Sequence, residues 1–198
     1  MSRNFAVLGK IASERPFPAS PTHGPATSRE YSELVRRLFN GPAAVAVVGV
    51  DSAEPMSEIC VSIATEVAAS NRRVLVVSVE TILSMDPVSI PDSSGFTPAS
   101  PNVWMWQSPT GPKLEIFRSE TSAGASWLDA LRRSFDFILL DCSFLQVASG
   151  AAQVAAAADK TVLVVHESQT EKQQIRSVQR SLQFAGATLT GSILVRQR

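Results

Sequence analysis

Residues 43–80 read AAVAVVGVDSAEPMSEICVSIATEVAASNRRVLVVSVE, and this stretch decides the fold. The apolar run Ala43–Gly49 predicts a short buried strand, and Gly49–Met56 is expected to be a loop. Apolar side chains at helical spacing predict a helix over Ser57–Ser70, and a second buried strand follows at Val74–Ser78. In α/β proteins, a loop between such a strand and helix can hold phosphates on its backbone N–H groups. The stretch therefore has the layout of a phosphate-binding unit.

The remaining chain continues the alternation of apolar strands and helices. This alternation predicts an α/β fold, a three-layer, doubly wound, mostly parallel sheet with helices on both faces. The segment Thr81–Pro112 is rich in Pro, Ser and Thr, and we expect it to be irregular apart from one short strand. The further helices are expected at Ser28–Phe39, Ala123–Arg133, Val147–Ala158 and Thr170–Ala185, and the further strands at Asn102–Trp106, Leu114–Phe117, Phe137–Leu140, Thr161–Val165 and Ser192–Val195.

Length and composition indicate one cytoplasmic domain behind an N-terminal extension. Residues 28–198 suffice for a domain with a full core, and the Pro-rich residues 1–27 are expected to be a flexible segment. The 18 Lys and Arg residues balance the 18 Asp and Glu residues, so bulk charge does not favour nucleic acid as a partner. No apolar run approaches the ~20 residues that span a bilayer, so no direct membrane insertion is expected. Cys60 and Cys142 fit two small core residues in a reducing compartment.

Three further stretches carry a family resemblance. In the helix before the first strand, Glu33 and Arg36 fit an E-x-x-R-x-x-R motif whose third position is Phe39 here. The unit SWLDALRRSFDFILLDCSFL places Asp141 at the end of a buried strand, and the closing segment ADKTVLVVHESQTEKQQIRSVQRSLQFAGATLTGSILVRQR completes the pattern. These features resemble the cytoplasmic domain of bacterial tyrosine kinases of capsule and exopolysaccharide synthesis. That family belongs to the P-loop group that includes the chromosome-partitioning and septum-positioning ATPases.

The resemblance covers about residues 29–196 and implies a P-loop NTPase-like fold with Asp141 at the Walker B aspartate. It also implies that the helix before the first strand is an interaction surface. The expected interaction residues are Tyr31, Glu33, Arg36 and Arg37.

The chemical positions of the family's phosphate loop are altered in this chain. An ungapped alignment sets a loop ending in G-K-[ST] against GVDSAEPMS, so that Pro55 replaces the glycine, Met56 the lysine, and Ser57 keeps the hydroxyl. Proline removes a backbone donor, and methionine supplies neither a donor nor a positive charge. Each lost charge-assisted hydrogen bond is worth about 1.5–3 kcal/mol. The degenerate loop residues are Gly49, Asp51, Ser52, Ala53, Glu54, Pro55, Met56 and Ser57.

Three carboxylates, of Asp51, Glu54 and Glu58, stand where a triphosphate would lie. One unscreened like-charge contact costs about 4 kcal/mol at an intermediate dielectric. Together with the lost hydrogen bonds, this repulsion would weaken triphosphate binding by ~1,000-fold or more. The same carboxylates could hold a divalent cation, but acidic residues in a helix's first turn also complement its dipole, and we favour the second interpretation. No lysine lies nearby in the sequence, since the four are Lys10, Lys113, Lys160 and Lys172.

Other family positions also depart from the pattern. The Walker A′ aspartates are replaced by Ser78-Val79-Glu80, Val195 stands where an adenine-reading asparagine is common, and the only tyrosine is Tyr31.

His23 and His166 have no visible catalytic or metal-ligating neighbours, so surface positions are expected for both. Trp104 and Trp106 share one side of a short strand and are expected in the core, although an exposed pair would suit partner docking.

The favoured hypothesis is a catalytically degenerate kinase- or ATPase-like protein that acts by binding in bacterial exopolysaccharide synthesis and export. The resemblance implies as partner a membrane-bound polysaccharide chain-length regulator, an active kinase paralogue or another copy of the chain, so membrane association would go through that partner. No cofactor is expected. One alternative is an active ATPase or tyrosine autokinase, with Asp141 and Ser57 on Mg²⁺ and ATP as cofactor. A second alternative is a nucleotide-independent positioning or polarity protein.

Overall fold

The computed structural model describes residues 4–8, 35–36, 38–39, 41–51, 56–83, 96–106, 123–143, 150–167 and 170–196. Within this part of the chain, one eight-stranded sheet has the order β1-β8-β7-β2-β6-β3-β5-β4. The strands are β1 (Asn4–Leu8), β2 (Ala43–Gly49), β3 (Val74–Ser78), β4 (Phe96–Ser100), β5 (Val103–Trp106), β6 (Phe137–Cys142), β7 (Lys160–His166) and β8 (Leu189–Arg196). The helices are α2 (Met56–Ala68), α3 (Val79–Leu83), α4 (Ala123–Arg132), α5 (Ala151–Ala157) and α6 (Lys172–Phe184).

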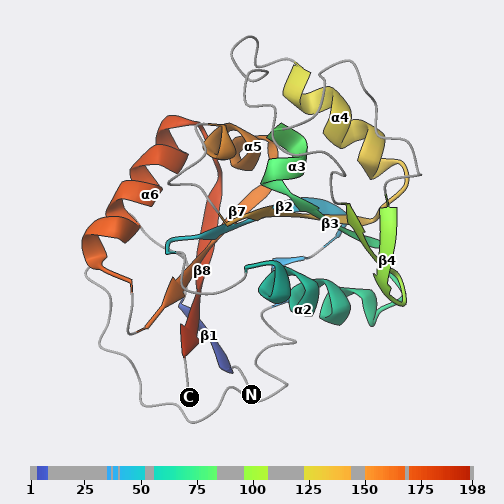
Figure 1. Ribbon diagram of the computed structural model, residues 1–198, viewed down its shortest axis with the longest axis horizontal. Coiled ribbons are helices and arrows are strands. Elements are labelled where there is room, and N and C mark those ends of the chain that lie inside the picture. Colours follow the sequence, from blue (N-terminus) through green and yellow to red (C-terminus); the bar gives the residue numbers. More distant parts are fainter. Residues whose placement is uncertain are drawn as a thin grey trace.

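The sheet is mostly parallel, as the sequence predicts. Strand β2 pairs in parallel with β6 and β7, β3 pairs in parallel with β5 and β6, and β7 does so with β8. Only the outer strands β1 and β4 run antiparallel to their neighbours in the described sheet. Helix α2 covers one face of the sheet, and α3, α4, α5 and α6 cover the other (Figure 1). The fold is therefore the expected three-layer, doubly wound α/β architecture.

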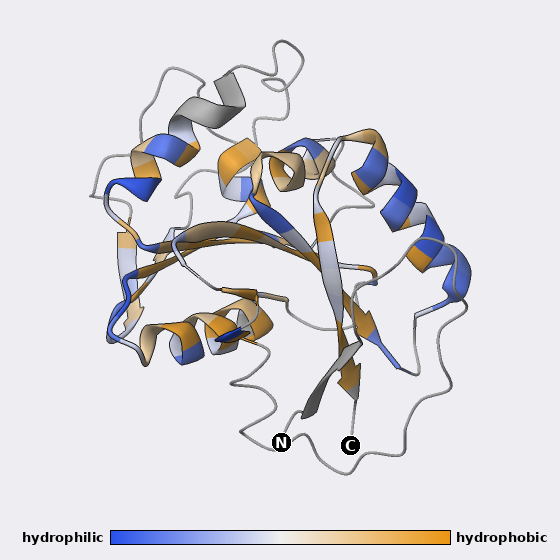
Figure 2. Ribbon diagram, turned by 180° about the vertical axis from the view of Figure 1, so that it is seen from behind, coloured by the Kyte–Doolittle hydropathy of each residue, from blue (hydrophilic) through white to orange (hydrophobic). Residues whose placement is uncertain are grey.

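Strand β2 lies at the centre because both of its faces are apolar. Its alternate side chains Val45 and Val47 join the core under α2, while Ala44, Ala46 and Val48 join the core on the opposite face. Parallel strands that are buried on both faces require such continuous apolar runs. Figure 2 shows the central strands as a hydrophobic layer with helices on both sides, of which α6 is largely hydrophilic.

The segment that the composition predicts to be irregular contains two elements that we did not predict, α3 and β4. An aromatic cluster fixes β4 in place. The ring of Phe96 lies 5.8 Å from that of Trp106 and 5.3 Å from that of Phe135, and the ring of Trp104 lies 5.6 Å from that of Phe135. Trp106 is thus buried, as expected, and Trp104 is partly buried and packs against the same core. The possible strand at Leu114–Phe117 lies outside the described residues.

Five residues of the segment 1–27, which the sequence predicts to be flexible, form a strand. Residues 4–8 are strand β1, which pairs with β8 from Asn4 opposite Arg196 to Leu8 opposite Ser192. An added strand satisfies the backbone N–H and C=O groups along the edge of β8, which is the physical reason for order in this short sequence. Residues 9–27 lie outside the described part, so the proposed domain boundary at residue 28 stays a prediction.

Only the end of the predicted helix Ser28–Phe39 is described. Val35, Arg36 and Leu38 are helical, and the side chains of Val35, Leu38 and Phe39 enter the core beneath α2. Arg36 is exposed, which fits its predicted role in an interface. Tyr31, Glu33 and Arg37 lie outside the described residues, so the interaction helix stays a prediction.

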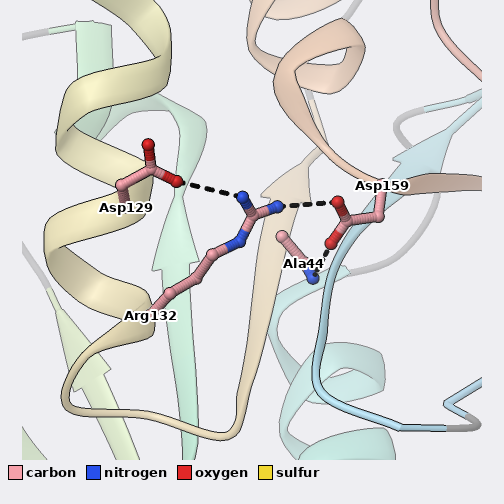
Figure 3. A network of polar contacts seen from close by, with 4 residues as sticks. All are labelled: Ala44, Asp129, Arg132 and Asp159. Atoms are coloured by element: carbon pink, nitrogen blue, oxygen red, sulfur yellow. Dashed lines mark hydrogen bonds and ion pairs between the residues drawn. The ribbon is translucent and has the colours of Figure 1, made fainter.

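A polar network ties α4 to the sheet at the amino end of β2 (Figure 3). One carboxylate oxygen of Asp159 accepts a 2.7 Å hydrogen bond from the backbone N–H of Ala44, and the other accepts one from Arg132, also at 2.7 Å. Arg132 also reaches Asp129, one turn earlier on α4. The Arg132 pairs are partly exposed, whereas the Ala44 backbone is buried.

Asp159→Ala is expected to lower the free energy of unfolding by about 1–2 kcal/mol, because it leaves the buried N–H of Ala44 without its carboxylate acceptor. Arg132→Ala removes only exposed ion pairs and should cost at most about 1 kcal/mol. Urea unfolding of both variants measures the difference. Asp159→Asn keeps one acceptor oxygen and serves as the matched control. Equal losses for Asp159→Ala and Arg132→Ala would contradict this assignment.

Candidate functional site

The carboxyl ends of β2 and β7 define the candidate site. These strands are neighbours, but the chain leaves them in opposite directions: β2 leads through α2 towards β3, and β7 leads through α6 to β8. The two helices cover opposite faces of the sheet (Figure 1). In open α/β sheets, ligands bind in the crevice at such a topological switch point. Gly49 and Asp51, which begin the predicted loop after β2, therefore stand at the position where a ligand is expected.

Three side chains, those of Asp51, His166 and Thr170, cross this point in a closed ring of hydrogen bonds that we call the crevice cluster. The carboxylate oxygen Oδ1 of Asp51 lies 2.7 Å from Nδ1 of His166. The hydroxyl of Thr170 donates to the other oxygen of Asp51 and accepts a 2.9 Å hydrogen bond from the backbone N–H of His166. The cluster therefore links the first residues of the loop after β2 to the start of the β7–α6 connection.

The sequence analysis was wrong about His166, which is buried rather than on the surface. Its side chain is 3% exposed, and the side chain of its partner Asp51 is 10% exposed. Since a carboxylate only accepts hydrogen bonds, Nδ1 is the ring nitrogen that carries a proton. The other ring nitrogen, Nε2, is buried without a hydrogen-bond partner within the described structure. This orientation makes the imidazole a structural partner of Asp51.

Met56, which the sequence alignment sets against the family's lysine, points into the core. It is 2% exposed and belongs to the apolar cluster beneath the sheet together with Ile59 and Ile63. It also packs on the end of β2: a β-carbon added to Gly49 would lie 3.2 Å from Cγ and 3.3 Å from Sδ of Met56. The first residue of α2 thus fills the space next to Gly49 with apolar atoms.

Asp141 lies near the carboxyl end of β6, at the same edge of the sheet. It pairs in register with Val47 of β2 and Ser78 of β3. It is 5% exposed. Burial raises the pKa of its carboxyl, hydrogen bonds from the backbone N–H and hydroxyl of Ser143 oppose the rise, and the charge of Glu80 adds to it. A carboxylate in this environment is disfavoured in its charged form.

The structure brings four of the predicted loop residues together with Asp141 at one edge of the sheet. Gly49, Asp51, Met56 and Ser57 follow the end of β2, with Ser57 half-buried in the first turn of α2. Ser52, Ala53, Glu54 and Pro55 lie outside the described residues, as does the side chain of Glu58, so the idea of a cation site there stays untested. No group of three or more His, Cys, Asp and Glu side chains with metal-binding geometry occurs among the residues that the structure describes.

The sequence analysis missed His166 and Thr170. Their only signal is a pair of polar residues at the boundary between a predicted strand and helix, which does not reveal that Asp51, 115 residues earlier than His166, is the partner. Lys160 lies at the amino end of β7, and its Nζ donates a 2.8 Å hydrogen bond to the carbonyl oxygen of Leu38. Lys172, the other lysine in the described part of the chain, is exposed at the start of α6.

The two cysteines are buried and free, as expected. Burial raises the pKa of both thiols, and the nearby charge of Asp141 raises them further. A thiol whose thiolate is this disfavoured is a poor nucleophile and a poor metal ligand. Cys60 and Cys142 therefore act as small core side chains.

The fold matches several solved structures. The chimerical protein CapA2B2 aligns with a TM-score of 0.70 and 14% identity, over 86% of this chain and 84% of that chain. The kinase domain of the Escherichia coli tyrosine kinase ETK aligns with a TM-score of 0.66 and 13% identity, over 88% and 78% of the two chains. A ParA family ATPase from Chlorobium tepidum aligns with a TM-score of 0.53 and 16% identity, over 79% and 74%. This confirms the expected fold, and at such identities the likeness establishes the fold alone.

No protein-family model matches the chain, and no curated protein matches it in sequence. Among the described residues, no helix combines the length and apolarity that crossing a bilayer would require. The nucleotide that the fold group implies fits poorly at this site, because a buried methionine stands where the resemblance places a lysine, and the carboxyl group of Asp51 lies at the crevice.

Proposed function

We propose that this protein is a catalytically degenerate relative of the P-loop tyrosine kinases and ATPases, and that it works by binding a protein partner. The observation that carries this proposal is the position of Met56. In the family that the chain resembles, this residue is a lysine that reaches the phosphates. Here it is buried and packed against Gly49, with Cγ and Sδ within 3.3 Å of the place of an added β-carbon.

The crevice cluster supports the same proposal. Asp51 sits at the mouth of the phosphate loop, and its two carboxylate oxygens are engaged by His166 and Thr170. These hydrogen bonds hold an acidic side chain where a triphosphate would place its own charge. The internal carboxylate thus fills the electrostatic role that a bound phosphate has in a working site, and the loop has no need of nucleotide to be held at the sheet edge.

The proposed setting follows from the resemblance. A protein with the fold of a polysaccharide tyrosine kinase and an altered loop would serve in exopolysaccharide synthesis and export as a regulatory subunit. Its partner would be the cytoplasmic end of a membrane-bound chain-length regulator, an active kinase paralogue or another copy of the chain. Membrane association would then go through the partner, and the predicted interaction helix before β2 would be one of its contacts.

Titration with ATP and Mg²⁺ tests the central claim. We expect no heat of binding in calorimetry and no change in melting temperature at millimolar ATP. A site with micromolar affinity would be stabilised by about 4 kcal/mol at a thousandfold excess of ligand over its Kd, which a thermal shift detects easily. Micromolar binding, or ATP hydrolysis that Asp141→Ala abolishes, would instead establish the alternative of an active ATPase or kinase.

A further inference from the structure

Helix α6 presents a row of positive charges that ends in an exposed aromatic ring. Lys172, Arg176, Arg180 and Phe184 are spaced four residues apart, and all four are exposed. Side chains at this spacing are neighbours on a helix surface, with a rise of about 6 Å from each to the next. We call these four residues the α6 ridge. Phe184 is 96% exposed and is the one large apolar side chain that the described residues leave so open to solvent.

The buried side of α6 shows that this row faces away from the core. Val178 and Leu182 are buried in the core on that face of the sheet, and Ile175 packs against it. Successive residues are 100° apart around a helix, so Arg176 and Arg180 lie on the side away from these core residues. Helix α6 lies at the margin of the fold (Figure 1), and its outer side is hydrophilic (Figure 2).

Within helices α5 and α6, no carboxylate balances the row. The sequence of α6, KQQIRSVQRSLQF, contains no Asp or Glu, and the neighbouring α5, AAQVAAA, contains no charge. Glu171, just before the helix, is used as its cap and accepts a hydrogen bond from the backbone of the first turn. Within the described part of the chain, none of the three cations forms an ion pair. In a protein of balanced net charge, the ridge is thus a local excess of positive charge.

We propose that the α6 ridge docks an acidic segment of a partner protein, with carboxylates opposite Lys172, Arg176 and Arg180 and an apolar residue against Phe184. Arginine and aromatic side chains are the residue types that most often dominate the binding energy of protein interfaces. The inclined ridge formed at i, i+4 and i+8 matches an acidic helix with the same spacing, since such ridges pack into one another's grooves. The proposal rests on the proposed function only in that it takes protein binding to be the role of this chain.

A lipid surface fits the ridge less well. Each Lys or Arg gains about 1 kcal/mol near an anionic membrane, so three give only weak, salt-sensitive attraction. Stable interfacial helices add an apolar face that enters the bilayer. The apolar face of α6 is committed to the protein core, so only Phe184 could insert.

Fluorescence anisotropy tests the proposal on the full chain. The probe is a labelled helical peptide with glutamate at every fourth position beside a leucine stripe, at about 50 mM salt to limit screening. Arg176→Glu/Arg180→Glu is expected to weaken binding by at least about 30-fold, and Phe184→Ala by about tenfold. The control Arg72→Glu/Arg133→Glu makes the same charge change at other exposed positions and should stay within about threefold of the native protein.

Vesicles containing phosphatidylglycerol and a short DNA duplex are the comparison ligands. Peptide binding that the ridge variants lose and the control keeps supports the proposal. Peptide binding that both double variants lose equally, absence of peptide binding, or ridge-dependent binding to vesicles or DNA alone overturns it. The result is independent of the nucleotide titration, because the ridge residues lie outside the loop. A protein that binds ATP can still bind the peptide, and a protein that does not bind ATP can fail to bind the peptide.

Discussion

His166→Ala is expected to lower the free energy of unfolding by about 2–4 kcal/mol, the largest loss we predict for a residue outside the apolar core. The variant leaves the nearly buried carboxylate of Asp51 without the imidazole that lies 2.7 Å away. Removing one partner of a buried, charge-assisted hydrogen bond costs the unmade bond and the desolvation of the group left behind. Urea unfolding measures the loss, and for a chain of this size each kcal/mol should lower the melting temperature by about 2–4 °C.

The design includes two comparisons. His166→Asn keeps a nitrogen donor near the position of Nδ1, so it should recover part of the loss. A double-mutant cycle with Asp51→Asn should give a coupling energy of about 1–3 kcal/mol, because the two side chains are in direct contact. A loss of less than about 0.5 kcal/mol for His166→Ala, or additive single mutants, would show that the crevice cluster does not hold the loop to the sheet.

Much of the fold could be predicted because the central strands carry strong local signals. Val74–Ser78 and Ala43–Gly49 are continuous apolar runs, and both predicted strands match the structure at both ends. Strand β1 and strand β4 lack such signals. The five residues of β1 gain their order from pairing with β8 at the other end of the chain, and β4 contains Pro98 and depends on aromatic packing with Phe135. Order that arises from distant partners cannot be read from local composition.

The site was predictable in its place but not in its contacts. A loop after the first central strand had to lie at the carboxyl edge of the sheet, and Asp51 and Met56 are found there. From the sequence, we expected the carboxylate of Asp51 to repel a triphosphate. The structure shows that it is hydrogen-bonded to His166. Helical spacing does not tell whether the first residue of a helix, such as Met56, points outward or into the core. Both facts depend on tertiary contacts, and both bear directly on what the loop can bind.

Met56→Lys is expected to lower the free energy of unfolding by about 2–4 kcal/mol, since it places an ammonium group where a fully buried thioether now packs against Gly49. Burying an unpaired charge costs several kcal/mol, and the flexible lysine stem lowers this cost by letting the charge reach towards solvent. In a working phosphate loop, lysine at this position faces the ligand and costs the fold little. Urea unfolding with and without ATP and Mg²⁺ therefore measures how far position 56 has moved from ligand binding to core packing.

Met56→Leu is the matched control, because it keeps the volume and apolarity of the site and should cost less than about 1.5 kcal/mol. A lysine variant as stable as the leucine variant would mean that the side chain can leave the core without loss. If ATP then also raised its melting temperature, the loop would be a phosphate loop that lacks only its lysine. The expected outcome is a destabilised lysine variant that ATP does not rescue, because His166 and Thr170 hold the carboxyl group of Asp51 at the crevice.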